Sequence, residues 1–507
     1  MSKKLCLVYH VGALYGGHLD YSNELVGGFR NAGYDIDYIW LTHGKTESRN
    51  TQFEEYLNSS NGVDDTGKNV YNYTYYKHLA CWGNVEKGFV LDKTSYSNID
   101  QIERIRTRLD SYDIVMWQDV GNFNQKPLRE EHSTNWLRLF KRNNHKTKQI
   151  AMVHEHIMET RYPFLANIIH LFDQVISVHP AAYNKSVKLN KKTFLIPNPQ
   201  DISAMDTTHS NYDKLGNKEL FSMGAWKSSK RFQDIVAAVP YIDSDAKIYM
   251  AGDGIERRYL ATENEENMKE NYVASRATDP DIDSSTLTEN VIENGIWKRA
   301  HRVNPNFNYV GTLSKKQRDE RYDNASLFLD PAWYRENFKI GAHFSRVIIE
   351  AMIHGVVPIG RNLGLSNNVE GNGEFFTAGK NYIMIPYDST PKQFADIVNT
   401  SLGMSKSQYD TIVQTNYELV KDFAIENIIS QFTHIFNEDY ARLNLKLHTL
   451  DDSANTPDEE LMQMGLDLLT STSSKGFGIG IDALQSLEKE GILKLNYTEP
   501  ASLEDFF

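Results

Sequence analysis

The sequence has 507 residues, enough for two domains, and 40% of them are hydrophobic and 24% charged, as in a folded globular protein. No apolar run reaches the roughly 18–20 residues that a membrane-spanning helix needs, so we expect no membrane partner. The N-terminal apolar run breaks at His10 and Gly12, too early for a secretory signal. Two cysteines in so long a chain argue against a disulfide framework, and a cytoplasmic protein fits these features best.

The net charge of −13 is concentrated near the C-terminus. Residues 451–507 contain 12 acidic residues, three lysines and no arginine. The preceding part of the chain is therefore nearly balanced and can present local basic surfaces. Overall acidity does not exclude a nucleic-acid substrate.

The first half of the sequence alternates short apolar runs with helical stretches. The runs are "KLCLVYHVG", "YDIDYIWL", "YDIVMWQD", "KQIAMVHEH", "DQVISVHP" and "KKTFLIPNP". Such runs between helices are typical of a parallel sheet covered on both faces. Two prolines in "IPNPQD" at 196–201 interrupt the pattern. We therefore predict a Rossmann-like domain over residues 1–200.

The second half repeats this scheme with the runs "KELFSMGAW", "AKIYMAGDG", "FNYVGTL", "ASLFLDPAW", "VVPIGRN" and "YIMIPYD". The helix "SRVIIEAMIHG" is expected to end at Gly355. These elements predict a second Rossmann-like domain over 201–430, with a polar insertion at about 256–305. A closing helical segment (431–450) and a small acidic appendix (451–507) follow.

Two doubly wound α/β domains of this kind bind ligands at the carboxyl ends of their strands. The predicted fold class is therefore α/β, with two Rossmann-like domains that face a cleft. In the stretch "SMGAWKSSKRF", Lys227, Lys230 and Arg231 cluster where a helix is expected to begin. Basic side chains beside a helix N-terminus favour a bound phosphate. A solvated basic turn is the alternative.

The segment that runs from "FNYVGTLSKK" to "IEAMIHGVVPIG" resembles the nucleotide-sugar half of α-retaining GT-B glycosyltransferases. The matching positions are Gly311, Tyr322, Ala325, Pro331, Gly341, Glu350, Ala351, Met352 and Gly355. The early stretch "VYHVGALYGGHLDYSNEL" is similar to the family's first strand and glycine loop, which supplies Gly16 and Gly17.

This resemblance implies a UDP-sugar donor and neither a cofactor nor a metal. It implies that Glu350 accepts hydrogen bonds from the ribose hydroxyls, that Gly341 lets the backbone approach a phosphate, and that Lys230 neutralises the leaving diphosphate. A surface helix carboxylate is the alternative for Glu350. Many relatives have a second glutamate where this chain has Ala342, which leaves the sugar contacts open.

Three further stretches are similar to the DNA α-glucosyltransferases of T-even-type bacteriophages. They are "MVHEHIMETRYPFLANIIHLFDQVISVH", "MGAWKSSKRF" and "MAGDGIERR". Ala225 stands where that family has an arginine, and Lys227 is the candidate replacement. The similarity implies transfer of glucose or arabinose, with retention, to 5-hydroxymethylcytosine in double-stranded phage DNA, in the host cytoplasm.

The resemblance also implies an acceptor site in the first domain. His154 and Glu155 follow a predicted strand, where they could orient or deprotonate the acceptor hydroxymethyl group. Structural histidines beside a solvated glutamate are the alternative, and a zinc site lacks a nearby third ligand. His18, beside the first glycine loop, is a weaker candidate for contact with the acceptor.

A DNA acceptor requires contacts to phosphates. The stretch "TNWLRLFKRNNHKTK" would place Arg138, Lys141 and Arg142 on one helical stripe. A solvated charged face is the alternative. A base already in a duplex would have to be extruded before it is modified.

Two other functions remain open at this point. One is a GT-B transferase that acts on a polysaccharide or a lipid-linked acceptor. The other is a non-catalytic GT-B-like module that serves as a DNA accessory factor. The nearly intact donor motifs favour an enzyme over the second of these.

The C-terminal sequence "EPASLEDFF" contains Leu503, Phe506 and Phe507 beside two acidic residues. It resembles the peptides by which phage replication proteins bind the sliding clamp, and such a peptide buries its large apolar side chains in a pocket. A frayed terminus is the alternative.

Overall fold

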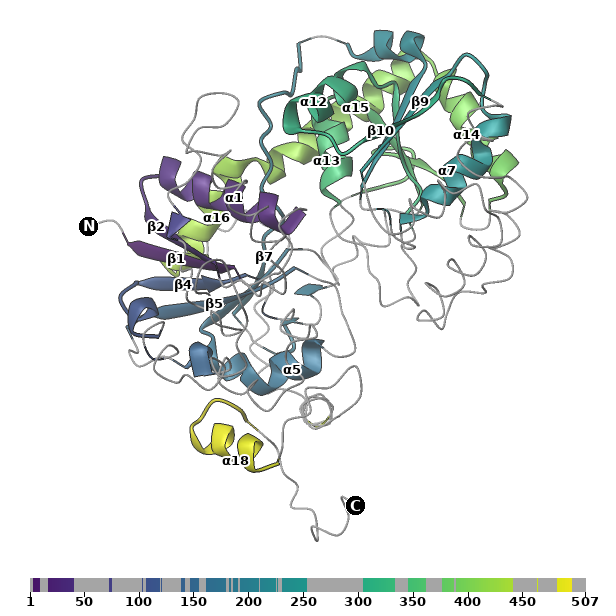
Figure 1. Cartoon of the computed structure of the whole chain (residues 1–507). Coiled ribbons are helices and arrows are strands. Elements are labelled where there is room, and N and C mark those ends of the chain that lie inside the picture. The colour runs from purple at the N-terminus through teal and green to yellow at the C-terminus, as the bar shows by residue number, and fades with distance from the viewer. Residues whose placement is uncertain are drawn as a thin grey trace, which may run out of the picture. The chain divides into compact units, whose positions relative to one another are not determined.

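The structure is a computed structural model. The chain divides into two compact units, and each is treated by itself (Figure 1). The first unit comprises Met1–Pro199, Val369–Asn372 and Ile425–Phe507, and the second comprises Gln200–Asn368 and Gly373–Ala424. The structure describes residues 3–9, 17–40, 73–74, 103, 106–118, 120, 138–141, 146–154, 161–178, 182–183, 186–189, 192–208, 210–224, 226, 230–252, 304–332, 345–361, 376–386, 389–440, 463 and 481–494.

The first unit is built on a parallel sheet with the strand order β3-β2-β1-β4-β5-β6-β7. Its apolar runs are buried as strands because helices cover both faces of such a sheet. The strands are β1 (Lys4–Tyr9), β2 (Asp35–Trp40), β3 (Tyr73–Thr74), β4 (Ile114–Trp117), β5 (Lys148–Val153), β6 (Gln174–Ser177) and β7 (Thr193–Leu195). Its helices include α1 (Gly17–Asn31), α5 (Arg161–Ile168), α16 (Ile425–Phe436) and α18 (Ile481–Lys489).

Helix α16 lies beside α1, although the two are far apart in sequence (Figure 1). A Cβ atom at Gly28 of α1 would lie 2.7 Å from side-chain atoms of both Ile425 and Ile429, so glycine is what allows this close approach. The Phe29 ring packs edge-on against Phe432 with centroids 5.4 Å apart. The chain therefore returns to the first sheet at Ile425, within the range 201–430 that the sequence assigns to the second domain.

The second unit has a parallel sheet with the strand order β10-β9-β8-β11-β12-β13. The strands are β8 (Glu219–Met223), β9 (Lys247–Ala251), β10 (Phe307–Gly311), β11 (Leu327–Asp330), β12 (Val357–Gly360) and β13 (Ile383–Met384). The helices are α7 (Phe232–Ala238), α12 (Lys315–Asn324), α13 (Arg346–Ile353), α14 (Pro391–Leu402) and α15 (Lys406–Val420). The predicted α/β class with two parallel sheets is confirmed.

Local sequence signals account for several of these helix ends. Helix α12 begins with a capping box in which the Ser314 side chain accepts from the Gln317 backbone and the Gln317 side chain accepts from the Ser314 backbone. Helix α13 ends where Gly355 adopts φ +67°, as the sequence predicts. A Cβ atom at Gly355 would lie 2.3 Å from Asn211, so the position excludes a side chain.

Candidate functional site

Glu350 lies on α13 between two arginines. Its side chain is 11% exposed, and Oε2 lies 3.5 Å from Nε of Arg318 on α12, while Oε1 lies 3.8 Å from Nη2 of Arg346 one turn earlier on α13. Both guanidiniums favour the ionised carboxylate. The Glu350 carboxylate is therefore largely enclosed, with a cation near each of its oxygens.

Tyr322 contacts the same carboxylate oxygen of Glu350 as Arg318 does. Its hydroxyl donates to the Val347 carbonyl at 2.9 Å and reaches Glu350 Oε2 at 3.4 Å. Burial raises the pKa of Tyr322 well above its ordinary value, and the Glu350 carboxylate raises it further. The phenol therefore stays protonated and can donate. The rings of Phe221 and Phe328 pack against the Tyr322 ring, with centroid distances of 5.1 and 5.6 Å.

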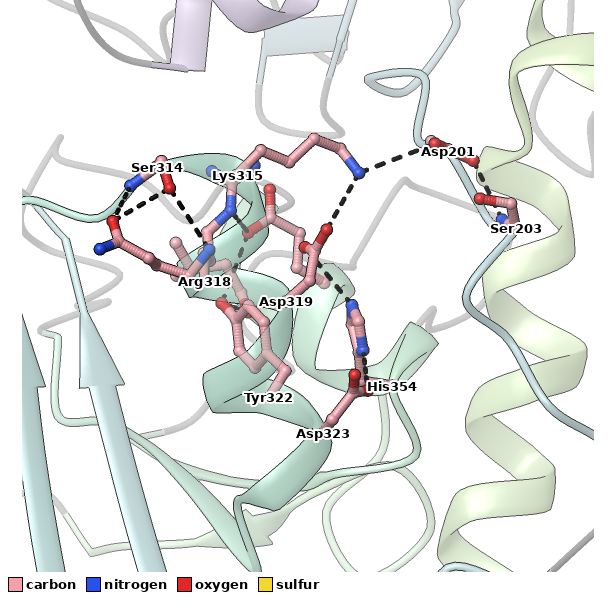
Figure 2. A network of polar contacts seen from close by, with 12 residues as sticks. Asp201, Ser203, Ser314, Lys315, Arg318, Asp319, Tyr322, Asp323 and His354 are labelled. Carbon is pink, nitrogen blue, oxygen red and sulfur yellow. Dashed lines mark hydrogen bonds and ion pairs between the residues drawn. The ribbon is translucent and has the colours of Figure 1, made fainter. Parts of the chain in front are cut away.

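A chain of charged groups continues from Tyr322 across α12 (Figure 2). His354 stacks on the Tyr322 ring with centroids 5.3 Å apart. Its Nδ1 contacts the Asp323 carboxylate at 2.8 Å, and its Nε2 lies 3.7 Å from Asp319. Lys315 lies 3.1 Å from Asp319 and 3.8 Å from Asp201, so these ion pairs extend to the start of the second unit.

The basic loop that the sequence singles out begins at the carboxyl end of β8. Gly224 and Gly252 touch there, since a Cβ atom at Gly252 would lie 2.0 Å from the Gly224 carbonyl oxygen. The buried Trp226 donates its indole N–H to the Ala251 carbonyl at 3.1 Å and stacks on Phe232 at 4.8 Å. The loop is thus attached to the end of β9 and to the first residue of α7.

Lys230 and Arg231 differ although they are adjacent. Lys230 is half-buried. Arg231 is buried and pairs with Asp234 through Nη2 and Nε at 2.7 and 3.1 Å. Arg361, which follows β12, also donates to Asp234. Arg231 is therefore directed onto a buried carboxylate of its own helix, whereas the sequence predicts it as a direct phosphate contact.

In the first unit, His154 comes directly after β5, at the carboxyl edge of the sheet and between β4 and β6 in strand order. It is buried, and its ring packs edge-on against Tyr21 of α1 with centroids 4.4 Å apart. Gly17 and His18 form the first turn of α1, which follows β1. The backbone of these residues therefore belongs to elements that begin or end at that edge.

Arg138 and Lys141 contact the C-terminal segment of the same unit. Arg138 donates from Nε and Nη2 to the two carboxylate oxygens of Glu490, at 2.8 and 2.5 Å. The Lys141 ammonium donates to the Glu490 carbonyl. Residues 138–140 form a short 3-10 helix, so the single α-helical stripe that the sequence predicts is wrong for this part. A 3-10 helix has three residues per turn, so it aligns positions three apart, as Arg138 and Lys141 are, but not positions four apart.

The segment that Arg138 holds ends in a Schellman motif. Gly491 adopts φ +70°, its N–H donates to the Glu488 carbonyl at 2.8 Å, and the Ile492 N–H donates to the Leu487 carbonyl at 2.8 Å. Leu487, Ile492 and Leu493 are buried. The Asn167 amide donates to the Lys494 carbonyl at 2.9 Å. This part of the predicted appendix is therefore packed against the first unit.

Solved structures provide a comparison for this arrangement of sheets and sites. Anabaena Alr3699/HepE in complex with UDP and glucose matches with a TM-score of 0.54 at 13% identity, over 86% of this chain and 100% of that one. An α-glucosyltransferase in complex with UDP and a 13-mer DNA containing a HMU base matches with a TM-score of 0.53 at 12% identity and the same coverage. Staphylococcus aureus TarM in complex with UDP matches with a TM-score of 0.52 at 11% identity.

The chain has the GT-B fold. The likeness at these identities concerns the fold, since no protein-family profile and no characterised protein matches the sequence. Three of the predicted or newly found groups follow strands at the carboxyl edge of the second sheet: Gly224, Lys230 and Arg361. His154 follows a strand at the carboxyl edge of the first sheet.

Several predicted site residues lie outside the described part of the GT-B chain. They are Gly16, Arg142, Glu155, Lys227, Gly341, Leu503, Phe506 and Phe507. Within the described residues, no group of three or more His, Cys, Asp or Glu side chains could hold a metal ion. None of the described helices is long and apolar enough to cross a membrane.

Other residues of this site escaped the sequence reasoning. Arg346 stands four residues before Glu350 on a predicted helix, and this spacing is a readable signal for an ion pair. Asp234 stands three residues after Arg231, a spacing that also signals an ion pair. Arg318 and Arg361 leave no comparable signal, because each contacts a carboxylate of another element that only the fold brings close.

Proposed function

We propose that this protein transfers glucose or arabinose from a UDP-sugar to 5-hydroxymethylcytosine in double-stranded phage DNA, with retention of the anomeric configuration. The observation that supports the nucleotide-sugar donor best is the Glu350 carboxylate, held between Arg318 and Arg346 in a GT-B fold. A fixed, ionised carboxylate can accept hydrogen bonds from both hydroxyls of a ribose. The enzyme would act in the host cytoplasm.

The donor would lie at the carboxyl edge of the second sheet. Glu350 would hold its ribose, and Lys230 would neutralise the charge that develops on the departing diphosphate. Gly341, Lys227, Gly16 and Gly17 are the further donor contacts that the sequence pattern suggests. Lys230 and Lys227 would supply the positive charge, so the proposal includes neither a metal nor a cofactor.

The acceptor would lie at the carboxyl edge of the first sheet. Packing against Tyr21 limits the orientations of the His154 ring, and Glu155 is the next residue. This pair would orient the hydroxymethyl group and accept its proton. His18 and the basic residues Lys141 and Arg142 remain candidates for contact with the DNA. Arg138 already has a carboxylate partner and is the weakest of these candidates.

One experiment tests the reaction itself. Duplex DNA with 5-hydroxymethylcytosine is incubated with the purified protein and a panel of UDP-sugars, and the nucleosides are analysed by mass. The expected result is a mass increase of one hexosyl or pentosyl group on 5-hydroxymethyl-2′-deoxycytidine alone, with unmodified cytosine DNA as the control. No mass increase with any donor would overturn the proposal.

A second candidate is transfer to a carbohydrate acceptor. It is favoured by TarM, solved in complex with Fondaparinux, α-GlcNAc-glycerol and UDP, which is as similar in fold as the DNA-bound neighbour. Adding oligosaccharide acceptors to the same assay separates the two. Sugar transfer to those acceptors, and none to DNA, would select the second candidate.

A further inference from the structure

Arg231 has an unusual backbone conformation at the point where the basic loop enters α7. It occupies the N-cap position with φ 54° and ψ 33°, in the left-handed region. Among the described residues only two other non-glycine residues, Lys218 and Glu438, have positive φ. Side chains other than Gly, Asn and Asp rarely adopt this conformation, so surrounding contacts must hold it.

Asp234 supplies the contact that holds Arg231. The two side chains are 8% and 14% exposed, and their paired hydrogen bonds join residues three positions apart. A guanidinium that donates twice to one carboxylate is fixed in orientation as well as in position. The pair therefore restrains the backbone of the left-handed turn directly after Lys230.

Arg361 joins this pair to the sheet. Its Nη1 donates to Asp234 and to the Pro331 carbonyl at 3.1 Å, and its side chain is 3% exposed. Pro331 follows β11 and Arg361 follows β12, two neighbouring strands with Asp330 opposite Gly360. Burial alone would raise the pKa of Asp234, but the two guanidiniums hold it below its ordinary value. The start of α7 is thus bound to the carboxyl ends of two strands.

We propose that the ion-pair cluster of Arg231, Asp234 and Arg361 positions Lys230 for the diphosphate of the nucleotide donor. The inference rests on the proposed function, because it takes the donor to be a UDP-sugar. Arg231, Asp234 and Arg361 are positioning residues, and Lys230 is the residue that contacts the phosphate. Trp226, on the other side of the basic run, donates its indole N–H to the Ala251 carbonyl at the end of β9.

The direction in which Asp234→Asn changes UDP affinity separates a positioning role from simple electrostatics. Asp234→Asn removes a negative charge near the diphosphate, so Coulomb attraction alone would strengthen UDP binding. Loss of positioning would weaken it. A purely structural role would weaken the binding of uridine, which has no phosphate, as much as that of UDP.

The test measures dissociation constants for UDP and uridine by calorimetry. For Asp234→Asn and Arg361→Met we expect UDP binding to weaken about tenfold while uridine binding changes less than about twofold. In a Lys230→Ala background the same substitutions should change UDP binding less than about twofold, because coupled residues are not additive. Thermal melting checks that each variant is folded.

Two further variants keep the test decisive if Asp234→Asn does not fold. Arg231→Asn retains a residue that tolerates the left-handed turn but removes the guanidinium, and it should lose UDP affinity as Asp234→Asn does. Because the lost positive charge would also weaken UDP binding, the deciding result is that this loss falls below about twofold in the Lys230→Ala background. Lys218→Asn is the matched control. Lys218 also has a left-handed backbone (φ 51°) and an ion pair with Asp245 at 2.6 Å, but it precedes β8, at the opposite edge of the sheet. It should leave both constants unchanged.

Tighter UDP binding in Asp234→Asn, equal losses for UDP and uridine, or a full loss that persists without Lys230 would each overturn the inference. UDP binding that depends on Lys230 but not on Asp234 would overturn this inference alone. A wild-type protein that binds no UDP would overturn the proposed function and this inference together.

Discussion

The guanidinium of Arg138 donates to both carboxylate oxygens of Glu490, at 2.8 and 2.5 Å, across 352 positions of sequence. The Arg138 guanidinium holds the pKa of Glu490 below its ordinary value. The Ser486 hydroxyl and the charge of Lys141 contribute smaller shifts in the same direction. The pair attaches the end of α18 to the first unit, beside the buried Leu487. The C-terminal segment therefore contributes to the stability of that unit.

Glu490→Ala should lower the free energy of unfolding by about 1–2 kcal/mol, because it removes a paired, charge-assisted hydrogen bond. Leu487→Ala should cost about 2–5 kcal/mol through the cavity it leaves. Urea unfolding measures both. Lys489→Ala, at an exposed position of the same helix, is the control and should have little effect. Equal stability of Glu490→Ala and wild type would contradict the docking.

Glu350→Gln should weaken UDP binding about tenfold or more, because it removes a charged acceptor without changing shape. Binding of 2′-deoxy-UDP should weaken less, since one of the hydroxyls that Glu350 accepts from is missing. Calorimetry with both ligands measures the difference. Glu320→Gln, an exposed carboxylate on α12, is the matched control. Unchanged UDP affinity in Glu350→Gln would remove Glu350 from the donor site.

The environment of His354 predicts a dependence of stability on pH. Burial alone would lower the pKa of His354, but Asp319 and Asp323 more than offset this, so the pKa lies above its ordinary value. Lys214 donates to the His354 carbonyl at 2.7 Å, and Lys315 pairs with Asp319. Imidazolium is thus more favourable in the folded than in the unfolded protein. Its stabilisation is fully present below the unfolded pKa of about 6.5 and is lost as the pH rises through the folded pKa.

The measurement is urea unfolding at about pH 6 and at about pH 8.5, on either side of the unfolded pKa. The free energy of unfolding of the wild type should be smaller at the higher pH than at the lower one, and the difference should be smaller in His354→Gln. Asp323→Asn should also flatten the dependence, because it removes the partner at 2.8 Å. Identical pH profiles for wild type and His354→Gln would show that this histidine does not titrate as described.

Glu155→Gln should slow sugar transfer about a hundredfold or more, if its carboxylate accepts the proton of the hydroxymethyl group. UDP affinity should stay the same, because Glu155 belongs to the acceptor side. Single-turnover assays on hydroxymethylated duplexes separate the chemical step from product release. A normal rate in this variant would exclude Glu155 from the chemistry.

Removal of residues 499–507 should abolish binding to the cognate sliding clamp and leave transfer to short oligonucleotides unchanged. The large apolar side chains of Leu503, Phe506 and Phe507 would supply most of the affinity of so small an interface. Surface plasmon resonance against the clamp measures this, with Glu499→Ala as a control outside the apolar group. Full-affinity binding by the truncated protein would exclude the tail as a clamp ligand.

The sequence by itself determined the local features of this fold. Apolar runs become strands because a sheet covered on both faces buries them. The capping box at Ser314 and the turn at Gly355 are set by neighbours within a few residues. The Arg346–Glu350 pair belongs to the same class, because both residues lie on one turn of one helix.

Tertiary structure decided which charged groups meet. Arg361 follows β12, and only the tertiary structure brings its guanidinium onto Asp234 of α7, 127 positions earlier in the sequence. Arg138 lies in a basic stretch that resembles a DNA-binding surface, yet its carboxylate partner comes from the far end of the chain. Local patterns cannot reveal such pairs, because an ion pair depends on distance in space while sequence periodicity reports neighbours along one element.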